Sequence, residues 1–261
     1  MANLRKSLVL SSSGSRLFVE LGVLKKLYEK GFSPHEIVGC SGGSLIGACL
    51  AAGKSIEETE SYFFKQNPLK LLDVKINSLG LIDGTKIVNS VLSFIGVKNF
   101  SELKMPLKVV ATNINSGNAV IFSKGSLFDA LRASIAVPGI FHPVILDDAV
   151  LVDGAVSNPL PINLVNKSNL VLAIDVSFYN RKITSKSKTY DLLNQIIFLN
   201  QNKIVKREVS DFPKDNFIYC RPEVSDYGMF EYKKERFLEM IFLGEAEAKK
   251  LVRKRIFKKF I

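Results

Sequence analysis

The stretch EIVGCSGGSLIGACLAAG, residues 36–53, places a strand pattern, a sharp turn and a helix pattern in immediate succession. Residues 36–40 form a short apolar run typical of a strand, and Gly53 ends the helix pattern that follows the turn. Ser41 stands at the turn, within G-x-S-x-G. A serine there is exposed at the N-terminus of a helix, where free N–H groups favour the negative charge that develops in acyl transfer.

The motif alone leaves two interpretations open. Gly39 and Gly43 fit a turn that exposes a nucleophile, and they fit equally a turn where helix and strand simply pack closely. A nucleophilic serine also needs a base. The chain has only two histidines, and the neighbouring prolines of His35 and His142 favour loop or packing roles for both. A carboxylate is therefore the next candidate.

Asp153 is that carboxylate. It ends the apolar run of LVDGA, residues 151–155, and precedes Gly154, so a turn at the end of a strand would present it to a cleft. The alternative is an ordinary Asp-Gly hairpin turn. To accept a proton from Ser41, the carboxylate must lie within hydrogen-bonding reach and be partly desolvated, which raises its pKa.

A loop rich in serine follows the first predicted strand, residues 7–10. Its successive backbone N–H groups would form an anion-binding concavity, and together with the N–H of Gly42 they would bind the oxyanion of a tetrahedral intermediate. The alternative is a flexible connection. The predicted loop donors are Ser12, Ser13, Gly14 and Ser15.

Short strand patterns alternate with longer helix patterns, which predicts a mostly parallel sheet with crossover helices. Ser55 and Glu58 predict a capping box for one of these helices. Residues 67–100 are mixed, with glycines that interrupt them, and residues 180–188 are either a flexible insertion or a surface loop. The predicted strands are 7–10, 36–40, 107–112, 119–122 and 170–175, and the predicted helices are 18–28, 45–52, 55–66 and 127–136.

The composition sets limits but does not choose a function. With 261 residues, 47% of them hydrophobic, the chain can build one large α/β domain or two small ones. A net charge of +11 favours an anionic partner, either nucleic acid, a membrane face or a charged substrate. The three cysteines lack zinc-ligand or C-x-x-C spacing, and no apolar run has the length of a signal or membrane span. We therefore expect a cytoplasmic protein, with a peripheral membrane location as the alternative.

Two further patterns suggest other functions. Gly53-Lys-Ser55 resembles the end of a phosphate-binding loop, but the glycine required upstream is Ala48, so the motif fails. Residues 245–261 hold seven Lys or Arg and two Glu, with apolar residues at helical spacing. Such a helix lies on an anionic membrane, or docks on the core with a solvated basic face. We expect no nucleic-acid partner, because no recognised motif accompanies these charges.

Five motifs occur in a fixed order along residues 7–176, and together they resemble the patatin-like phospholipases. The resemblance implies a three-layer α/β/α sandwich with a mostly parallel central sheet. We expect a single domain over residues 1–261, with its core at about 7–176 and a helical, basic extension over about 190–261. The resemblance also implies a Ser41–Asp153 dyad, a lipid ester substrate and no metal or other cofactor. The motifs are Gly14 with Arg16, Gly39–Gly43, Ala133-Ser-Ile-Ala-Val-Pro138, Asp153-Gly-Ala155 and Asn158-Pro-Leu-Pro161.

The loop after the first strand departs from that family. Where members usually have three glycines, a small residue, Arg and Gly, this chain has Ser12-Ser-Gly-Ser-Arg-Leu17. Serine keeps the N–H donor but disfavours positive φ, so we expect an altered or strained loop. Two functions follow: a lipid acyl hydrolase, in which Arg16 orients the loop or meets a phosphate head group, and a weakly active or inactive membrane-associated binding protein. The oligomeric state is not predicted.

Overall fold

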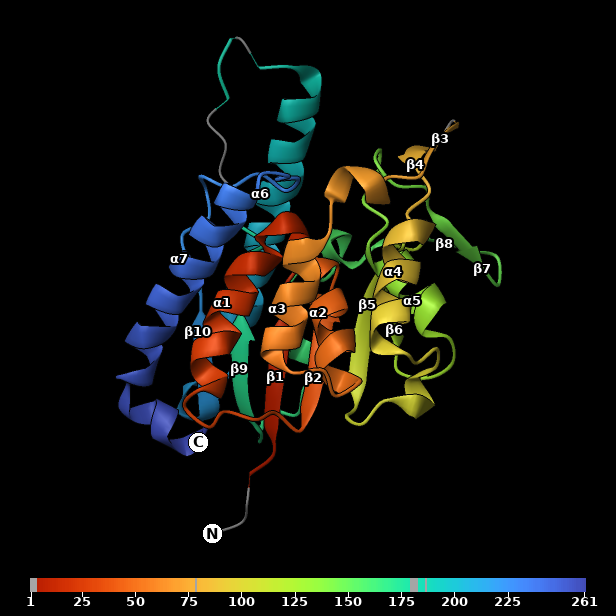
Figure 1. The fold of residues 1–261 in the computed structure, drawn as a ribbon. Coiled ribbons are helices and arrows are strands. Elements are labelled where there is room, and N and C mark those ends of the chain that lie inside the picture. The colour runs from red at the N-terminus through yellow and green to blue at the C-terminus, as the bar shows by residue number, and fades with distance from the viewer. Residues whose placement is uncertain (1–3, 78, 179–182, 186) are drawn as a thin grey trace.

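A mixed sheet forms the centre of the protein. The computed structural model describes residues 4–77, 79–178, 183–185 and 187–261. Within these residues, eight strands form one sheet in the order β10-β9-β1-β2-β5-β8-β7, with β6 paired to β5 outside this path (Figure 1). The parallel strands are β1 (Lys6–Leu10), β2 (Glu36–Cys40), β5 (Leu107–Asn113), β9 (Leu170–Ile174) and β10 (Phe217–Cys220). Antiparallel pairings add β6 (Ala119–Phe122), β7 (Val144–Leu146) and β8 (Ala149–Asp153).

Helices cover both faces of this sheet. The parallel strands are apolar on both sides: Leu8 packs into the larger core, under most of the helices, and Val9 into the smaller core, under α6. The fold is therefore the predicted three-layer α/β/α sandwich. The helices are α1 (Leu17–Tyr28), α2 (Gly42–Ala51), α3 (Ile56–Lys65), α4 (Thr85–Ile95), α5 (Leu127–Ser134), α6 (Thr189–Ser210) and α7 (Lys234–Val252). Short 3-10 turns are η1 (Gly14–Arg16), η2 (Pro68–Leu71), η3 (Phe100–Glu102), η4 (Gly154–Val156), η5 (Ile162–Leu164), η6 (Lys214–Asn216) and η7 (Arg255–Lys259).

The strand register brings the ends of β2 and β8 together. On β5, residues 107–110 pair with β2, and residues 111–113 pair with β8. Both strands lie on the same side of β5, because β6 occupies its other side opposite residues 109–112. Cys40 is thus the partner of Val110, and Asp153 is the partner of Ala111. The residues that follow β2 and end β8 therefore meet at one point of the sheet.

The C-terminal segment is docked on the core. Its helix α7 ends at Val252 and is followed by η7, so residues 245–261 are not one continuous helix. Ala248, Leu251, Phe257 and Phe260 are buried. Of the two predicted arrangements, docking with an exposed basic face is the one found. Among the described residues, no helix combines the length and apolar character needed to cross a membrane.

The region predicted as mixed holds more structure than expected. Residues 67–100 contain η2, a hairpin of β3 (Val74–Asn77) and β4 (Gly80–Ile82), and the helix α4. Gly84 and Gly96 adopt left-handed conformations at the two ends of α4, so these glycines bound the helix rather than interrupt it. The Ser55–Glu58 capping box is present at the start of α3, as predicted. The predicted insertion at 180–188 falls partly outside the described residues.

Candidate active site

Ser41 occupies a strained turn between β2 and α2. Its backbone has φ +51° and ψ −124°, a conformation that costs a non-glycine residue energy and persists only where the surroundings enforce it. The Ser41 N–H donates to Ser134 Oγ at 2.9 Å, and the Ser41 carbonyl accepts from the Ser44 N–H at 2.9 Å. Gly39 and Gly43 permit the tight turn, because a Cβ on Gly39 would lie 2.7 Å from the Gly43 carbonyl oxygen.

The Ser41 hydroxyl points at Asp153. Ser41 Oγ donates to Asp153 Oδ2 at 2.7 Å, and the N–H of Ala155 donates to Oδ1 at 2.8 Å. Asp153 is only 3% exposed. Burial raises the pKa of this carboxyl to about 7, although the hydrogen bonds from Ala155 and Ser41 oppose the increase. The site thus pairs a serine with a carboxyl group that titrates near neutrality.

Neighbouring groups fix the end of β8. The N–H of Asp153 donates to the Ala136 carbonyl at 2.9 Å, and Thr112 Oγ1 donates to the Asp153 carbonyl at 3.0 Å. Gly154 lies against β5 and β2, since a Cβ there would come within 3.0 Å of Cys40 Sγ and overlap the Val110 carbonyl. A larger residue at 154 would therefore force the backbone next to Asp153, or these neighbours, to shift.

Two of the predicted oxyanion donors in the loop already have backbone acceptors. The N–H of Ser12 donates to the Pro159 carbonyl at 2.8 Å, and that of Ser15 donates to the Met229 carbonyl at 2.8 Å, so neither faces an incoming anion. Gly14 and Gly42 are the first residues of η1 and α2, positions whose N–H groups have no acceptor within the helix. They lie side by side, because a Cβ on Gly42 would be 3.1 Å from Gly14 N and would overlap Ser13 Oγ.

The expected strain in this loop is not found. Gly14, with φ +56°, is the position that needs a glycine, and a Cβ on it would also lie 2.6 Å from the Met229 carbonyl oxygen. Ser13 has φ −130°, and neither Ser12 nor Ser15 is among the described non-glycine residues with positive φ. The serines that replace family glycines are therefore conformationally compatible with the loop.

Arg16 holds the loop in place from beneath. It is 1% exposed, and its Nε donates to the Ser13 carbonyl at 3.1 Å. Its Nη1 donates to the Phe178 carbonyl at 3.3 Å, and the guanidinium lies 5.8 Å from the Phe198 ring centroid. Of the two roles predicted for Arg16, these contacts support orientation of the loop.

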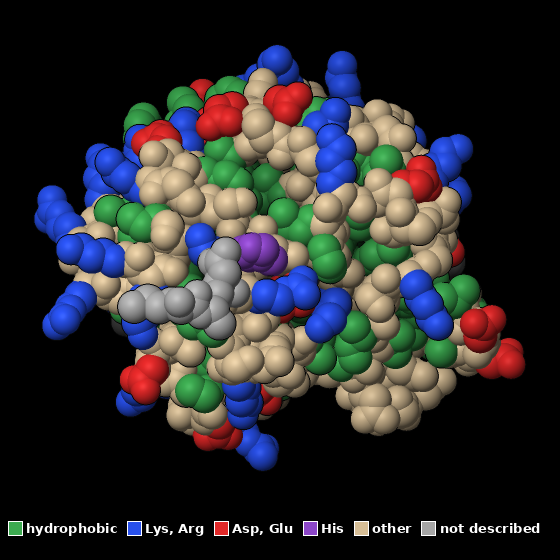
Figure 2. All heavy atoms as spheres, turned by 90° about the horizontal axis from the view of Figure 1, so that it is seen from below, with side chains coloured by type: hydrophobic (Ala, Val, Ile, Leu, Met, Phe, Trp, Pro, Cys, Tyr) green, Lys and Arg blue, Asp and Glu red, His purple; other side chains and the backbone are tan. Residues whose placement is uncertain are grey.

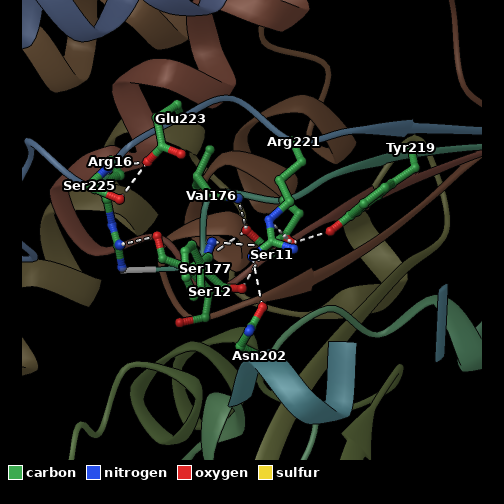
Figure 3. Close-up of polar contacts among 12 residues, drawn as sticks. Ser11, Ser12, Arg16, Val176, Ser177, Asn202, Tyr219, Arg221, Glu223 and Ser225 are labelled. Carbon is green, nitrogen blue, oxygen red and sulfur yellow. Dashed lines mark hydrogen bonds and ion pairs between the residues drawn. The ribbon is translucent and has the colours of Figure 1, made fainter. Parts of the chain in front are cut away.

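A buried polar network, which the sequence did not predict, anchors the same loop (Figure 3). Ser11 Oγ accepts the N–H of Val176 at 2.9 Å, which ties the end of β1 to the end of β9. The neighbouring Asp175 is buried and accepts from Tyr219 OH at 2.6 Å and Ser177 Oγ at 2.6 Å. Arg221 Nε lies 3.7 Å from Asp175 Oδ2, the oxygen that also accepts from Tyr219. These partners are far apart in the chain, so no local pattern records them.

Glu20 is a second buried carboxyl group near the site. It lies in α1 with no exposed surface, and Ser11 Oγ donates to its Oε1 at 3.4 Å. Burial raises its pKa well above the ordinary value for a glutamate. Burial thus disfavours a negative charge on Glu20, close to the loop that follows β1.

Ser41 and Asp153 line a cavity of about 440 Å³, together with Gly14 and Gly42. Most of its walls are apolar, including Phe18, Leu45, Phe63, Ile135, Val137 and Phe237. Neither histidine lines it, and His35 Nδ1 instead accepts the Lys6 N–H at 3.0 Å. In the described part of the chain, no group of three or more His, Cys, Asp or Glu residues is placed to hold a metal ion.

Comparison with known proteins found matches in sequence and in fold. The family model described as patatin-like phospholipase matches residues 8–165. Uncharacterized NTE family proteins of Mycobacterium tuberculosis and Mycobacterium bovis are 35% identical over 175 residues, 66% of this chain and 49% of theirs. Patatin-like phospholipase domain-containing protein 7 of Mus musculus is 27% identical over 180 residues, 65% of this chain and 13% of its own.

A solved structure shares the fold. VipD from Legionella pneumophila superimposes with a TM-score of 0.65 at 13% identity, covering 99% of this chain and 67% of that one. The present chain spans about half the length of its mycobacterial relatives.

Proposed function

The chain belongs to the patatin-like phospholipase family, and from that premise we propose that it hydrolyses acyl esters of lipids, with Ser41 as nucleophile and Asp153 as base. The family as a whole supports lipid acyl hydrolysis. The observation that carries the more specific proposal is the 2.7 Å hydrogen bond from Ser41 Oγ to a buried carboxylate, at a strained turn that opens into an apolar cavity.

The proposed reaction has two halves. Asp153 accepts the proton of Ser41 Oγ as this oxygen attacks the ester carbonyl, and the N–H groups of Gly14 and Gly42 stabilise the oxyanion. Collapse of the intermediate expels the alcohol, which takes the proton back from Asp153 and leaves an acyl-serine. Water, activated by the same carboxylate, then releases the fatty acid.

The cavity lining supports a long apolar acyl group as the part of the substrate held next to Ser41. A pocket wall of aliphatic and aromatic side chains stabilises a bound alkyl chain by removing both from water. The positive net charge of +11 further suits an anionic lipid or membrane as the source of that chain.

Fatty-acid release from a panel of phospholipids, lysophospholipids and triacylglycerols tests the proposal. We expect release by the unmodified protein, and a loss of at least about 10³-fold in Ser41→Ala and Asp153→Asn. Asp148→Asn is the matched control, because it makes the same change at an exposed turn where an asparagine tolerates φ +63°. Equal rates in all four proteins would contradict the dyad, and a folded protein that releases no fatty acid from any lipid would favour a binding role.

A further inference from the structure

Helix α6 exposes its more aliphatic side to solvent. Its buried side carries Gln195, Phe198, Gln201 and Val205, so two of the four inward positions are amides. Its outward side, in the first half of the helix, carries Leu192, Leu193, Ile196 and Ile197, each between 40% and 55% exposed. A surface helix normally shows the opposite distribution, so this face points to an apolar partner.

The exposed face of α6 is continuous with the wall of the cavity. Four large hydrophobic residues both line the cavity and are between 40% and 62% exposed: Leu69 on η2, Ile197 on α6, and Phe230 and Tyr232 before α7. In Figure 1 the first turns of α6 project beyond the central sheet. They lie at the end of the sheet where β1 finishes, opposite to the N-terminus. The apolar surface therefore extends from the site to the projecting turns of α6.

Exposed lysines flank this surface. Lys70 is adjacent to Leu69, Lys188 precedes α6, and Lys233 is adjacent to Tyr232. Lysines beside exposed aliphatic and aromatic side chains are typical of surfaces that bind anionic membranes, where the side chains enter the acyl region and the ammonium groups meet phosphates.

We infer that this mouth surface, formed by Leu69, Leu192, Leu193, Ile196, Phe230 and Tyr232, docks the protein on an anionic lipid bilayer. The inference rests on the proposed function, because it supplies the route by which a lipid ester reaches Ser41. An acyl chain that leaves the bilayer along a continuous apolar wall avoids water. Each methylene group that is kept out of water makes this transfer about fourfold more favourable.

The basic C-terminal segment faces the other way. In Figure 1 the C-terminus lies beside the N-terminus, at the end of the sheet opposite to the projecting turns of α6. Figure 2 shows that end, with Lys and Arg side chains spread around most of its edge. A bilayer bound there would be separated from the cavity by the whole length of the strands.

Vesicle flotation tests the inference without any turnover, in proteins that carry Ser41→Ala. We expect binding to vesicles of equimolar phosphatidylcholine and phosphatidylglycerol, and at least about tenfold weaker partitioning when Leu192→Ser, Leu193→Ser and Ile196→Ser are added. None of these three residues lines the cavity. The matched control changes Ile121, Phe242 and Ile261 to Ser, which are between 44% and 65% exposed away from α6, and it should bind within about twofold of the parent. Replacing Lys70, Lys188 and Lys233 by Glu should weaken binding to these vesicles but not to pure phosphatidylcholine.

Each result separates docking from catalysis. With Ser41 intact, the α6 triple variant should hydrolyse a soluble short-chain ester at the unchanged rate and lose activity on vesicles. If the protein hydrolyses no ester, the proposed function is overturned. If the α6 triple variant nevertheless loses vesicle binding, the docking surface is still supported. Equal vesicle binding by the triple variant and its control would overturn the inference. So would a dimer in solution that only the triple variant dissociates, with no vesicle binding, because the surface would then join two copies of the chain.

Discussion

At the scale of single residues, the environment of Asp153 determines the chemistry. One carboxylate oxygen accepts from Ser41 Oγ, and the other accepts from the Ala155 N–H, so both oxygens are oriented. Burial nevertheless dominates and raises the pKa of the group to about 7. A base whose pKa is near the working pH is ionised often enough to accept a proton and basic enough to hold it.

The rate of ester hydrolysis should therefore depend on the ionisation of Asp153. With a soluble short-chain ester, we expect the rate to rise with pH and to reach a plateau above a midpoint near 7, because only the carboxylate accepts the Ser41 proton. Initial rates across the pH range measure this midpoint. A rate that is flat from acid to neutral pH would contradict Asp153 as the base.

The same pKa predicts how stability varies with pH. Folding raises the pKa of Asp153 from 3.8 to about 7, so the protonated carboxyl favours the folded state. This contribution to the free energy of unfolding is fully present below pH 3.8 and is lost as the pH rises through 7. The loss amounts to roughly 4 kcal/mol, and Asp153→Asn escapes it. Urea unfolding of both proteins should show the variant gaining in relative stability as the pH rises. A difference in unfolding free energy that stays constant with pH would show that the pKa of Asp153 is not raised in the native state.

At the scale of elements, the segment before α7 is fastened to the oxyanion loop through Ser15. Ser15 Oγ donates to the Gly228 carbonyl at 3.0 Å and accepts from the Glu231 N–H at 3.0 Å. The Ser15 N–H adds a third bond, to the Met229 carbonyl. Residues 229–232 line the cavity, and the position of this segment depends on a residue more than 200 positions earlier.

Replacing Ser15 by Ala should loosen this segment. The variant keeps the backbone bond to Met229 but loses both side-chain bonds, each worth about 1 kcal/mol. We expect faster amide hydrogen exchange at residues 228–232 with little change in β2 or α2. Replacing the exposed Ser168 by Ala is a control for the substitution itself. Unchanged exchange in the Ser15 variant would mean that other contacts hold the segment.

The elements that could be predicted from the sequence are those set by residues close together in the chain. The strand-turn-helix around Ser41, the capping box of α3 and the strands β5 and β6 depend on neighbouring residues, and all are found. The Ser41–Ser134 bond spans 93 positions, and the Ser15–Gly228 bond spans 213. Such pairs exist only once the sheet order is set. The N–H directions that exclude Ser12 and Ser15 as oxyanion donors depend on those distant partners too.

At the scale of the whole molecule, the C-terminal part is packed into the body of the fold. α7 crosses α1 at two glycines: a Cβ on Gly22 would overlap the Ile241 carbonyl, and one on Gly244 would overlap the Val19 carbonyl. β10 extends the central sheet beside β9. These contacts support a single folding unit over the described chain, which remains a proposal.

Alanine at either of these glycines tests that proposal. Gly22→Ala and Gly244→Ala should each lower the free energy of unfolding by about 2–3 kcal/mol, because two helix backbones must separate. Gly228→Ala is the control, since its nearest neighbour would be at an ordinary 3.5 Å. Urea unfolding followed by circular dichroism should show one shifted transition. Two separate transitions, with only one of them shifted, would mean that the C-terminal part unfolds independently.

The central claim is that Ser41 is a nucleophile activated by Asp153, and site-mapped labelling by a fluorophosphonate tests it most directly. We predict one modified serine, Ser41, found by mass spectrometry of the peptides, with labelling abolished in Ser41→Ala and strongly slowed in Asp153→Asn. Ser12→Ala is the matched control, because Ser12 also lines the cavity but its change should leave the reaction intact. Labelling at another serine, or none at all in the folded protein, would contradict the account.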